Sequence, residues 1–302
     1  AVSLHTTQDT PSEIHEAQQA VLSQLHGVVQ VKKFFKKYPL MSLVVDSNAV
    51  HELATLHRMV DQVDLDQDLA GHGSGSLRGH ANTNAPVQEA EPIHQRRARI
   101  QREHRYMLDY SVPLIGADDR HALGNKGAGI TVAVLDTGCD SDHPDLMGRG
   151  SFVHKYDACF GDPDYDGRHV LDQEGFCPNG SDRQSGNGSG EDDNGHGTTV
   201  TGIITSNGQA HLAPPGVAPD ANIITLKVLD AKNRFFVPSE IVDALEYLVD
   251  LLEQDPQAVD IINLSLGTGQ VFEGTCDSQK FYQKWSFAAI QTMREQYNVT
   301  TL

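Results

Sequence analysis

A nearly continuous apolar segment at residues 130–135 (ITVAVL) is followed directly by Asp136. Such a segment, rich in β-branched residues, is typical of a strand that is buried on both faces. Two similar segments occur at 222–229 and 259–266, and they alternate with segments whose apolar residues have helical spacing, at 197–206, 239–253 and 277–296. The alternation predicts an α/β fold, in which a parallel sheet has helices on both faces.

The first 65 residues show a different pattern, in which shorter helices and strands follow one another. The predicted elements are a helix at 13–26, strands at 28–35 and 40–45, a helix at 47–59 and a strand at 60–65. This α-β-β-α-β order predicts a small α+β unit of the ferredoxin-like type that lacks its opening strand.

Composition divides the chain further. From Asp66 to about Asn84 the chain is rich in Gly, His, Ser and Asn and has no apolar periodicity, which indicates a linker. A basic cluster at 94–105 is either a solvated helix face or an exposed site for proteolytic processing. We therefore expect an N-terminal unit at 1–70, a linker at 71–105 and an α/β domain at 106–302.

The last four residues of the sequence, 299–302, have the pattern of the first half of a further strand. A parallel sheet that ended there would expose an apolar edge to water. The pattern therefore predicts that the chain is a fragment with an incomplete sheet.

Charge and cysteine content narrow the class of function. The 41 acidic and 23 basic side chains give a net charge of -18, which disfavours binding to nucleic acid or to anionic membranes. No apolar segment reaches the roughly 20 residues of a membrane-spanning helix. The four cysteines, at 139, 159, 177 and 276, form no Cys-x-x-Cys pair of the kind that binds zinc. Cys159 and Cys177 flank a Gly- and Asp-rich loop, which suits either a disulfide in an exported protein or two buried thiols.

The candidate chemistry lies in two short segments. Asp136 follows a buried strand, and the carboxyl ends of strands are where open α/β sheets bind ligands. His196 stands between glycines at the start of a predicted helix. A basic histidine needs a buried acceptor that fixes its tautomer, so the two residues together predict the acid and base of a hydrolase. The alternatives are a solvated turn aspartate and a helix-capping histidine. An aspartic peptidase would require a second Asp-Thr/Ser-Gly segment, which the sequence lacks.

Four segments in order resemble the subtilisin-like serine peptidases, the subtilases of type S8. They are Asp136-Thr137-Gly138, His143-Pro144-Asp145-Leu146, Gly195-His196-Gly197-Thr198 and Ile262-Asn263-Leu264-Ser265-Leu266-Gly267. Residues 28–68 resemble the inhibitory propeptide of such enzymes. The resemblance implies a subtilisin-like α/β fold and a secreted serine endopeptidase that hydrolyses polypeptides. It also implies a zymogen whose own propeptide is an intramolecular inhibitor.

The same resemblance assigns roles to residues. Asp136 would orient His196, and His196 would take the proton from a serine hydroxyl. In this family the serine follows the histidine by about 150 residues, and fewer residues than that follow His196 here. No serine stands in a Gly-Thr-Ser-x-Ala segment, and the oxyanion asparagine is also missing. We expect the 302-residue chain to be inactive alone. The alternative is a non-catalytic pseudo-peptidase or peptide-binding domain.

By the same comparison, Ser265, Leu266 and Gly267 match the rim of the substrate cleft, where backbone groups pair with an extended peptide. The segment Asn233-Arg234-Phe235 would lie near the opposite rim.

The implied chemistry requires no cofactor. A structural calcium ion is the one metal that the sequence raises as an open question. Residues 162–167 imitate the start of a calcium-binding loop, but the twelfth position is Gln173 and the glutamate comes one residue later. A solvated acidic loop is therefore favoured. Asp145 is a second candidate calcium ligand by resemblance, or else the cap of a helix.

Overall fold

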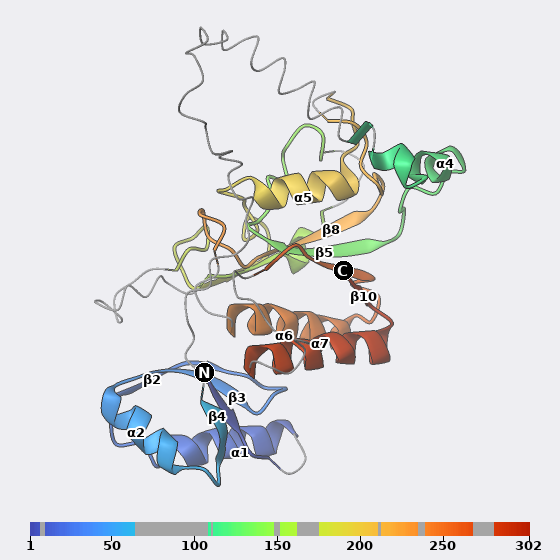
Figure 1. Ribbon diagram of the computed structural model, residues 1–302. Helices are drawn as coiled ribbons and strands as arrows, with labels where there is room; N and C mark the ends of the chain where they lie inside the picture. The colour runs from blue at the N-terminus through green and yellow to red at the C-terminus, as the bar shows by residue number, and fades with distance from the viewer. Residues whose placement is uncertain are drawn as a thin grey trace, which may run out of the picture.

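The N-terminal part of the chain folds as a four-stranded antiparallel sheet with two helices (Figure 1). The computed structural model describes residues 1–6, 10–63, 108–109, 111–147, 152–161, 175–210, 213–234, 239–267 and 281–302. The sheet order is β2-β3-β1-β4. The elements are β1 (Val2–Leu4), α1 (Pro11–Leu22), β2 (Val29–Phe34), β3 (Leu40–Val45), α2 (Ser47–Thr55) and β4 (Val60–Val63).

The predicted helices and strands of this unit are present, and one prediction about it is wrong. We expected the opening strand to be missing, but β1 pairs with both β3 and β4. Three residues are too few to show a strand period in the sequence, whereas pairing on both sides makes the strand plain in the structure. Val2 and Leu4 are buried against Val21 of α1 and Leu53 of α2, so β1 is part of the core of this unit.

The larger unit contains a six-stranded, mostly parallel sheet; the sequence predicted the parallel sheet but not its strands β6 and β7. Its order is β10-β9-β5-β8-β6-β7, and only β7 runs antiparallel to its neighbour. The strands are β5 (Thr131–Asp136), β6 (Ala158–Phe160), β7 (Arg183–Ser185), β8 (Asn222–Lys227), β9 (Ile261–Leu264) and β10 (Thr300–Thr301). Two short helices, α4 (Ala117–Ala122) and η1 (His154–Tyr156), lie outside the sheet.

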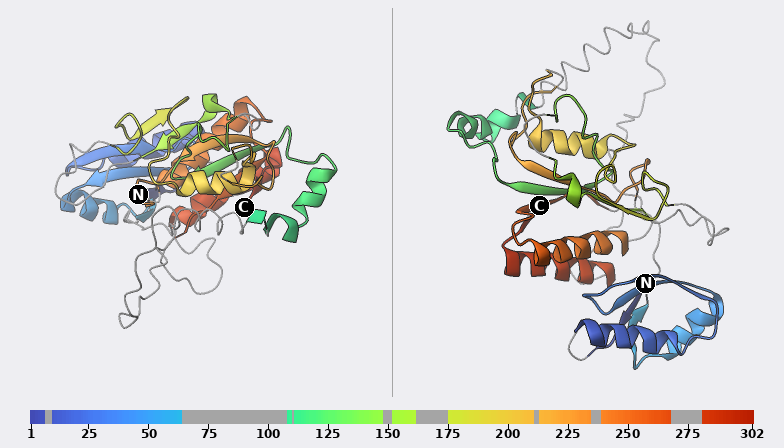
Figure 2. Two further views of the ribbon diagram at one scale, coloured as in Figure 1. Left: turned by 90° about the horizontal axis from the view of Figure 1, so that it is seen from above. Right: turned by 180° about the vertical axis from the view of Figure 1, so that it is seen from behind.

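Helices cover both faces of this sheet. The helix α5 (His196–Thr205) lies on one face, and α6 (Ser239–Gln254) and α7 (Phe281–Tyr297) lie on the other (Figures 1 and 2). The strand β5 explains why, since its side chains alternate between two apolar clusters. Val132 and Val134 pack in the cluster of α5, while Ala133 and Leu135 pack in the cluster of α6 and α7. Both faces of β5 are thus buried, and its last residue, Asp136, lies between the two layers.

The N-terminal unit packs against α6 and α7, on the side of the sheet opposite to α5 (Figure 1). Phe35, Tyr38 and Leu40 belong to the same buried cluster as the α6 and α7 side chains. The ring of Tyr38 lies 5.6 Å from the ring of Trp285 in α7. The two units therefore bury apolar side chains against each other, while the N-terminal unit also keeps an apolar cluster of its own.

Two expectations concern parts of the chain that the structure does not describe. The predicted linker at 71–105 and its basic cluster at 94–105 lie outside the described residues.

Within the described parts, no helix has both the length and the apolarity needed to span a membrane.

Candidate active site

The structure brings the two predicted dyad residues into contact. Asp136 ends β5, and its side chain is completely buried. His196 is the first residue of α5, and its Nδ1 lies 2.7 Å from Oδ1 of Asp136. An acid from the end of a central strand and an imidazole from the start of a helix thus form one hydrogen-bonded pair, although 60 residues separate them in sequence.

Glycine makes this approach of α5 to β5 possible. A Cβ atom on Gly197 would lie 2.0 Å from the carbonyl oxygen of Gly138 and 3.1 Å from Cβ of Asp136. No side chain can be accommodated at the first of these distances. Gly138 itself has a φ of +112°, a conformation that residues with a side chain rarely adopt. The glycines around both dyad residues are therefore needed for the contact.

The environment of Asp136 suits a residue that orients an imidazole. Burial raises the pKa of Asp136, and hydrogen bonds from His196 and from the backbone N–H of Thr137 partly offset this effect. An ionised carboxylate can only accept hydrogen bonds, so Nδ1 of His196 is the donor and Nε2 is left as the basic nitrogen. The side chain of His196 is 19% exposed, so the imidazole is not fully sealed from solvent.

A buried lysine fixes the backbone next to the dyad. Lys227 is the β8 residue paired with Asp136 in register, and it is completely buried. Its ammonium donates to the carbonyl oxygen of Thr137 at 2.6 Å and to Oδ1 of Asp193 at 2.7 Å. Because a buried charge must be paired, these contacts hold together the segment after Asp136 and the segment before His196.

A second acid, Asp192, contacts both sides of the dyad and was not among the residues predicted from the sequence. Its carboxylate accepts hydrogen bonds from the hydroxyl of Thr137 and from the backbone of Gly195 and Thr198. A signal was available, since acids and asparagine just before a helix start are typical capping residues. The sequence alone did not show which of the residues 191–194 would turn inward.

The predicted substrate-binding segment lies at the same edge of the sheet as Asp136. The strand β9 runs parallel to β5 with Leu264 opposite Leu135, so Ser265, Leu266 and Gly267 follow at the carboxyl edge. Ser265 is exposed and Leu266 packs partly against the core.

On the other predicted rim, Asn233 is buried and has a left-handed φ of 60°. Arg234 is ion-paired with Asp230 at 2.9 Å. Phe235 lies outside the described residues.

The candidate calcium ligands do not form a site among the described residues. The acidic loop at 162–174 is not described. Asp145 starts no helix, so the capping alternative is wrong. Its two carboxylate oxygens accept the backbone N–H groups of Ala210 and Ala213 at 2.7 and 2.8 Å. Across the described ranges, no group of three or more His, Cys, Asp or Glu side chains is placed to hold a metal ion.

The cysteines behave as two classes. Cys159 and Cys177 form a disulfide, so the alternative of two buried thiols is wrong for this pair. Cys139 is a buried free thiol, and burial raises its pKa to about 12. Cys276 lies outside the described residues.

Comparison with known proteins gives matches that cover the larger unit. The model of the subtilase family matches residues 127–300. The major intracellular serine protease of Bacillus subtilis is 34% identical over 160 residues, which are 53% of this chain and 41% of that protein. The minor extracellular protease Vpr of the same organism is 36% identical over 160 residues, 53% of this chain and 16% of the relative. Subtilisin E, also from Bacillus subtilis, is 29% identical over 168 residues, 56% and 35% of the two chains. The chain thus spans less than half the length of each of these relatives.

Proposed function

The chain belongs to the subtilase family of serine peptidases, and from this premise we propose that it provides the acid and the base of a serine endopeptidase. The observation that carries the proposal is the 2.7 Å contact between His196 Nδ1 and the buried carboxylate of Asp136. This contact supports the proposal, because the acid and the base of a serine triad are joined by such a hydrogen bond.

In the proposed reaction, Nε2 of His196 accepts the proton of a serine hydroxyl while the serine oxygen attacks the carbonyl carbon of a peptide bond. Asp136 holds the imidazole in the correct tautomer and stabilises the imidazolium that forms. The imidazolium then gives its proton to the leaving amine as the C–N bond breaks, and water, deprotonated by the same imidazole, releases the acyl group from the serine. All of these steps use protein side chains, so we propose that no cofactor takes part in the chemistry.

The nucleophile is the group that the 302-residue sequence does not supply, because it contains no Gly-Thr-Ser-x-Ala segment. We therefore propose that the chain as printed does not hydrolyse peptide bonds by itself.

Polypeptide substrates suit the edge of the sheet that carries the dyad. An extended peptide can pair with the backbone of Ser265, Leu266 and Gly267, which continue β9 beyond its last strand residue. Such pairing would align a scissile bond along the edge where Asp136 and His196 meet.

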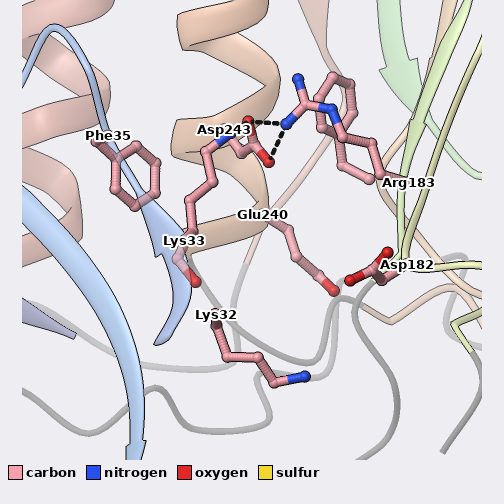
Figure 3. Close-up of a pocket in the computed structure, with 9 residues that line it drawn as sticks. Lys32, Lys33, Phe35, Asp182, Arg183, Glu240 and Asp243 are labelled. Atoms are coloured by element: carbon pink, nitrogen blue, oxygen red, sulfur yellow. Dashed lines mark hydrogen bonds and ion pairs between the residues drawn. The ribbon is translucent and has the colours of Figure 1, made fainter. Parts of the chain in front are cut away.

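We propose that the N-terminal unit, within residues 1–70, is the propeptide and inhibits the enzyme intramolecularly. Its contact with the α/β unit is rich in opposite charges (Figure 3). Lys33 of β2 and Arg183 of β7 both bind Asp243 of α6, and Arg183 reaches both carboxylate oxygens at 2.8 Å. These residues border a cavity of about 140 Å³ between β2, β7 and α6.

The acidic face of α6 continues this contact. Glu246 accepts the backbone N–H groups of Lys36 and Lys37 at 2.7 and 2.8 Å. The ammonium of Lys37 is paired with Asp250 at 3.1 Å and with Glu253 at 2.6 Å. The N-terminal unit is thus held by a basic turn on an acidic helix face, and a cut between Asp66 and Tyr110 would turn it into a separable subunit.

The disulfide supports a secreted protein, because disulfides persist in oxidising compartments. The relatives include one protease named intracellular and one named extracellular, so the comparison does not favour either location.

A peptide-binding pseudo-peptidase is the second candidate. The observation that favours it is the missing Gly-Thr-Ser-x-Ala segment. A stop codon directly after residue 302 would support this candidate, whereas such a segment further along the reading frame would support the peptidase.

The test of the peptidase proposal is casein hydrolysis by the complete gene product and its His196→Ala variant. We expect hydrolysis by the unmodified protein and a loss of at least about 10³-fold in the variant, as in other serine peptidases. His121→Ala is the control, since His121 lies outside the dyad and its Nε2 bonds to the carbonyl oxygen of Val217. Undiminished hydrolysis by His196→Ala would refute the proposal.

A further inference from the structure

Asp192 connects the strand that carries Asp136 to the helix that carries His196. Its Oδ1 accepts the hydroxyl of Thr137 at 2.8 Å and the backbone N–H of Gly195 at 3.0 Å. Its Oδ2 accepts both the backbone N–H of Thr198, at 2.9 Å, and the hydroxyl of the same residue. One side chain thus binds the residue after Asp136 and residues on both sides of His196.

The two threonine hydroxyls make this connection reciprocal. A hydroxyl has a single proton, so a hydroxyl that donates to Asp192 must act as an acceptor in its other contacts. Thr137, at the end of β5, accepts the N–H of Gly197 in α5 at 2.9 Å. Thr198, in α5, accepts the N–H of Asp140, after β5, at 2.9 Å. Each hydroxyl therefore crosses from one element to the other, and the direction of both bonds is set by the carboxylate.

Asp192 also takes the place of a helix cap. Gly195 stands at the N-cap position of α5 and has no side chain to accept the first N–H groups of the helix. Burial raises the pKa of Asp192, but the N–H groups of Gly195, Asn194 and Thr198 and the hydroxyl of Thr198 outweigh that effect and lower it to about 2. The group is therefore an anion at neutral pH. An anion at a helix start opposes the positive end of the helix dipole, which would otherwise disfavour an imidazolium at the first helical residue.

We propose that Asp192 is a positioning residue for the dyad, which holds His196 against Asp136 by accepting both threonine hydroxyls. The inference rests on the proposed function, because fixing this pair matters for activity only if the pair transfers protons. It concerns a geometry, however, and the geometry can be measured on the 302-residue chain without any activity.

The experiment follows the Nδ1 proton and the tautomer of His196 by NMR, in the 302-residue chain labelled with 15N-histidine. Asp192→Asn leaves one acceptor oxygen in place of two, so one hydroxyl loses its partner. We expect Asp192→Asn to speed exchange of the Nδ1 proton with water by about tenfold, the factor for one lost hydrogen bond, and to populate a second tautomer. Thr137→Val should do the same, and Thr137→Ser, which keeps the hydroxyl, should restore the original behaviour.

Two controls set the lower and upper limits of the effect on the Nδ1 proton. Glu191→Gln removes a neighbouring charge that takes no part in these contacts and should leave the proton unchanged, whereas Asp136→Asn should abolish its protection. Circular dichroism verifies that each variant is folded. The inference is overturned if Asp192→Asn and Thr137→Val lower the melting temperature but leave exchange and tautomer unchanged, because that pattern indicates a purely structural role. Failure of the proposed function would appear elsewhere, as undiminished hydrolysis by His196→Ala in the complete gene product.

Discussion

Removal of the Glu246 carboxylate should release the N-terminal unit from α6 while both units stay folded. Glu246 is 3% exposed, and one of its oxygens accepts the backbone N–H groups of Lys36 and Lys37. A hydrogen bond to a charged group contributes about 1.5–3 kcal/mol. Two such bonds are lost on undocking, but the two N–H groups then bind water, which offsets part of the lost free energy. We therefore expect Glu246→Ala to weaken docking by about 2–4 kcal/mol, or roughly 30- to 700-fold in the equilibrium constant.

Trp285 provides the assay, because it is the only tryptophan of the chain and is 7% exposed against Tyr38 at this interface. Undocking exposes it to water, so its emission in a urea titration should change at a lower urea concentration in Glu246→Ala. Glu253→Ala is the matched control on the same helix. Its side chain is 53% exposed, and an exposed ion pair contributes only about 0–1 kcal/mol. Equal shifts in the two variants, or no shift in Glu246→Ala, would refute the reasoning.

The same variant has a pH dependence of known sign. Burial is the largest cause that raises the pKa of Glu246 above its usual 4.5. The docked protein then binds this proton more tightly than the undocked protein, in which Glu246 loses its cover, so the contribution of Glu246 to docking is full below about pH 4.5 and decreases as the pH rises through the raised pKa. Both N–H groups donate to Oε1, so a proton on Oε2 leaves both bonds intact. The difference between the unmodified chain and Glu246→Ala should therefore be larger at pH 5 than at pH 8.

Three further predictions concern the α/β unit. Gly197→Ala places a methyl group against backbone and should abolish the protected histidine proton in NMR. Gly202→Ala is the control in the same helix, and it should raise the melting temperature because its added methyl group meets no atom within 4 Å. A protected proton in Gly197→Ala, or its loss in Gly202→Ala, would contradict the packing argument. Replacement of Cys159 and Cys177 by serine should lower the free energy of unfolding in urea by about 3 kcal/mol, because the disulfide closes a separation of 18 residues. An unchanged urea midpoint would contradict this prediction, because it would mean that the disulfide does not restrict the unfolded chain. The pKa of Asp192, lowered from 3.8 to about 2, gives a contribution that is full above about pH 4 and disappears as the pH falls to 2. After a discount for partial exposure, this contribution to the free energy of unfolding amounts to about 1 kcal/mol. The free energy of unfolding of Asp192→Asn, measured against pH, should not show this decrease between pH 4 and 2.

The elements of the fold that could be predicted are those with a long, regular apolar pattern. The strand β5 and the helix α6 were found because each buries enough residues to show its period. The strand β1 was not found, because its three residues are too few and its pairing with β3 and β4 depends on segments far away in sequence. The antiparallel strand β7 was missed for the same reason.

At the site, local motifs predicted the residues that meet but not those that hold them. Asp136 and His196 stand in recognisable segments, and their contact follows from the strand and the helix that carry them. Asp192 was missed because its role depends on how the turn at 192–195 folds back on Thr137. Glu246 has the sequence pattern of a solvated helix face, and its partners come from about 210 positions earlier in the chain.

The most direct test of the central claim is a double-mutant cycle of peptide hydrolysis in the complete gene product, with Asp136→Asn, His196→Ala and the pair together. If the two residues act as one unit, the account predicts that each single variant loses at least about 10³-fold in kcat. The double variant should then lose little more than His196→Ala alone. Losses that multiply, or a single variant that keeps its activity, would contradict the claim that Asp136 acts through His196.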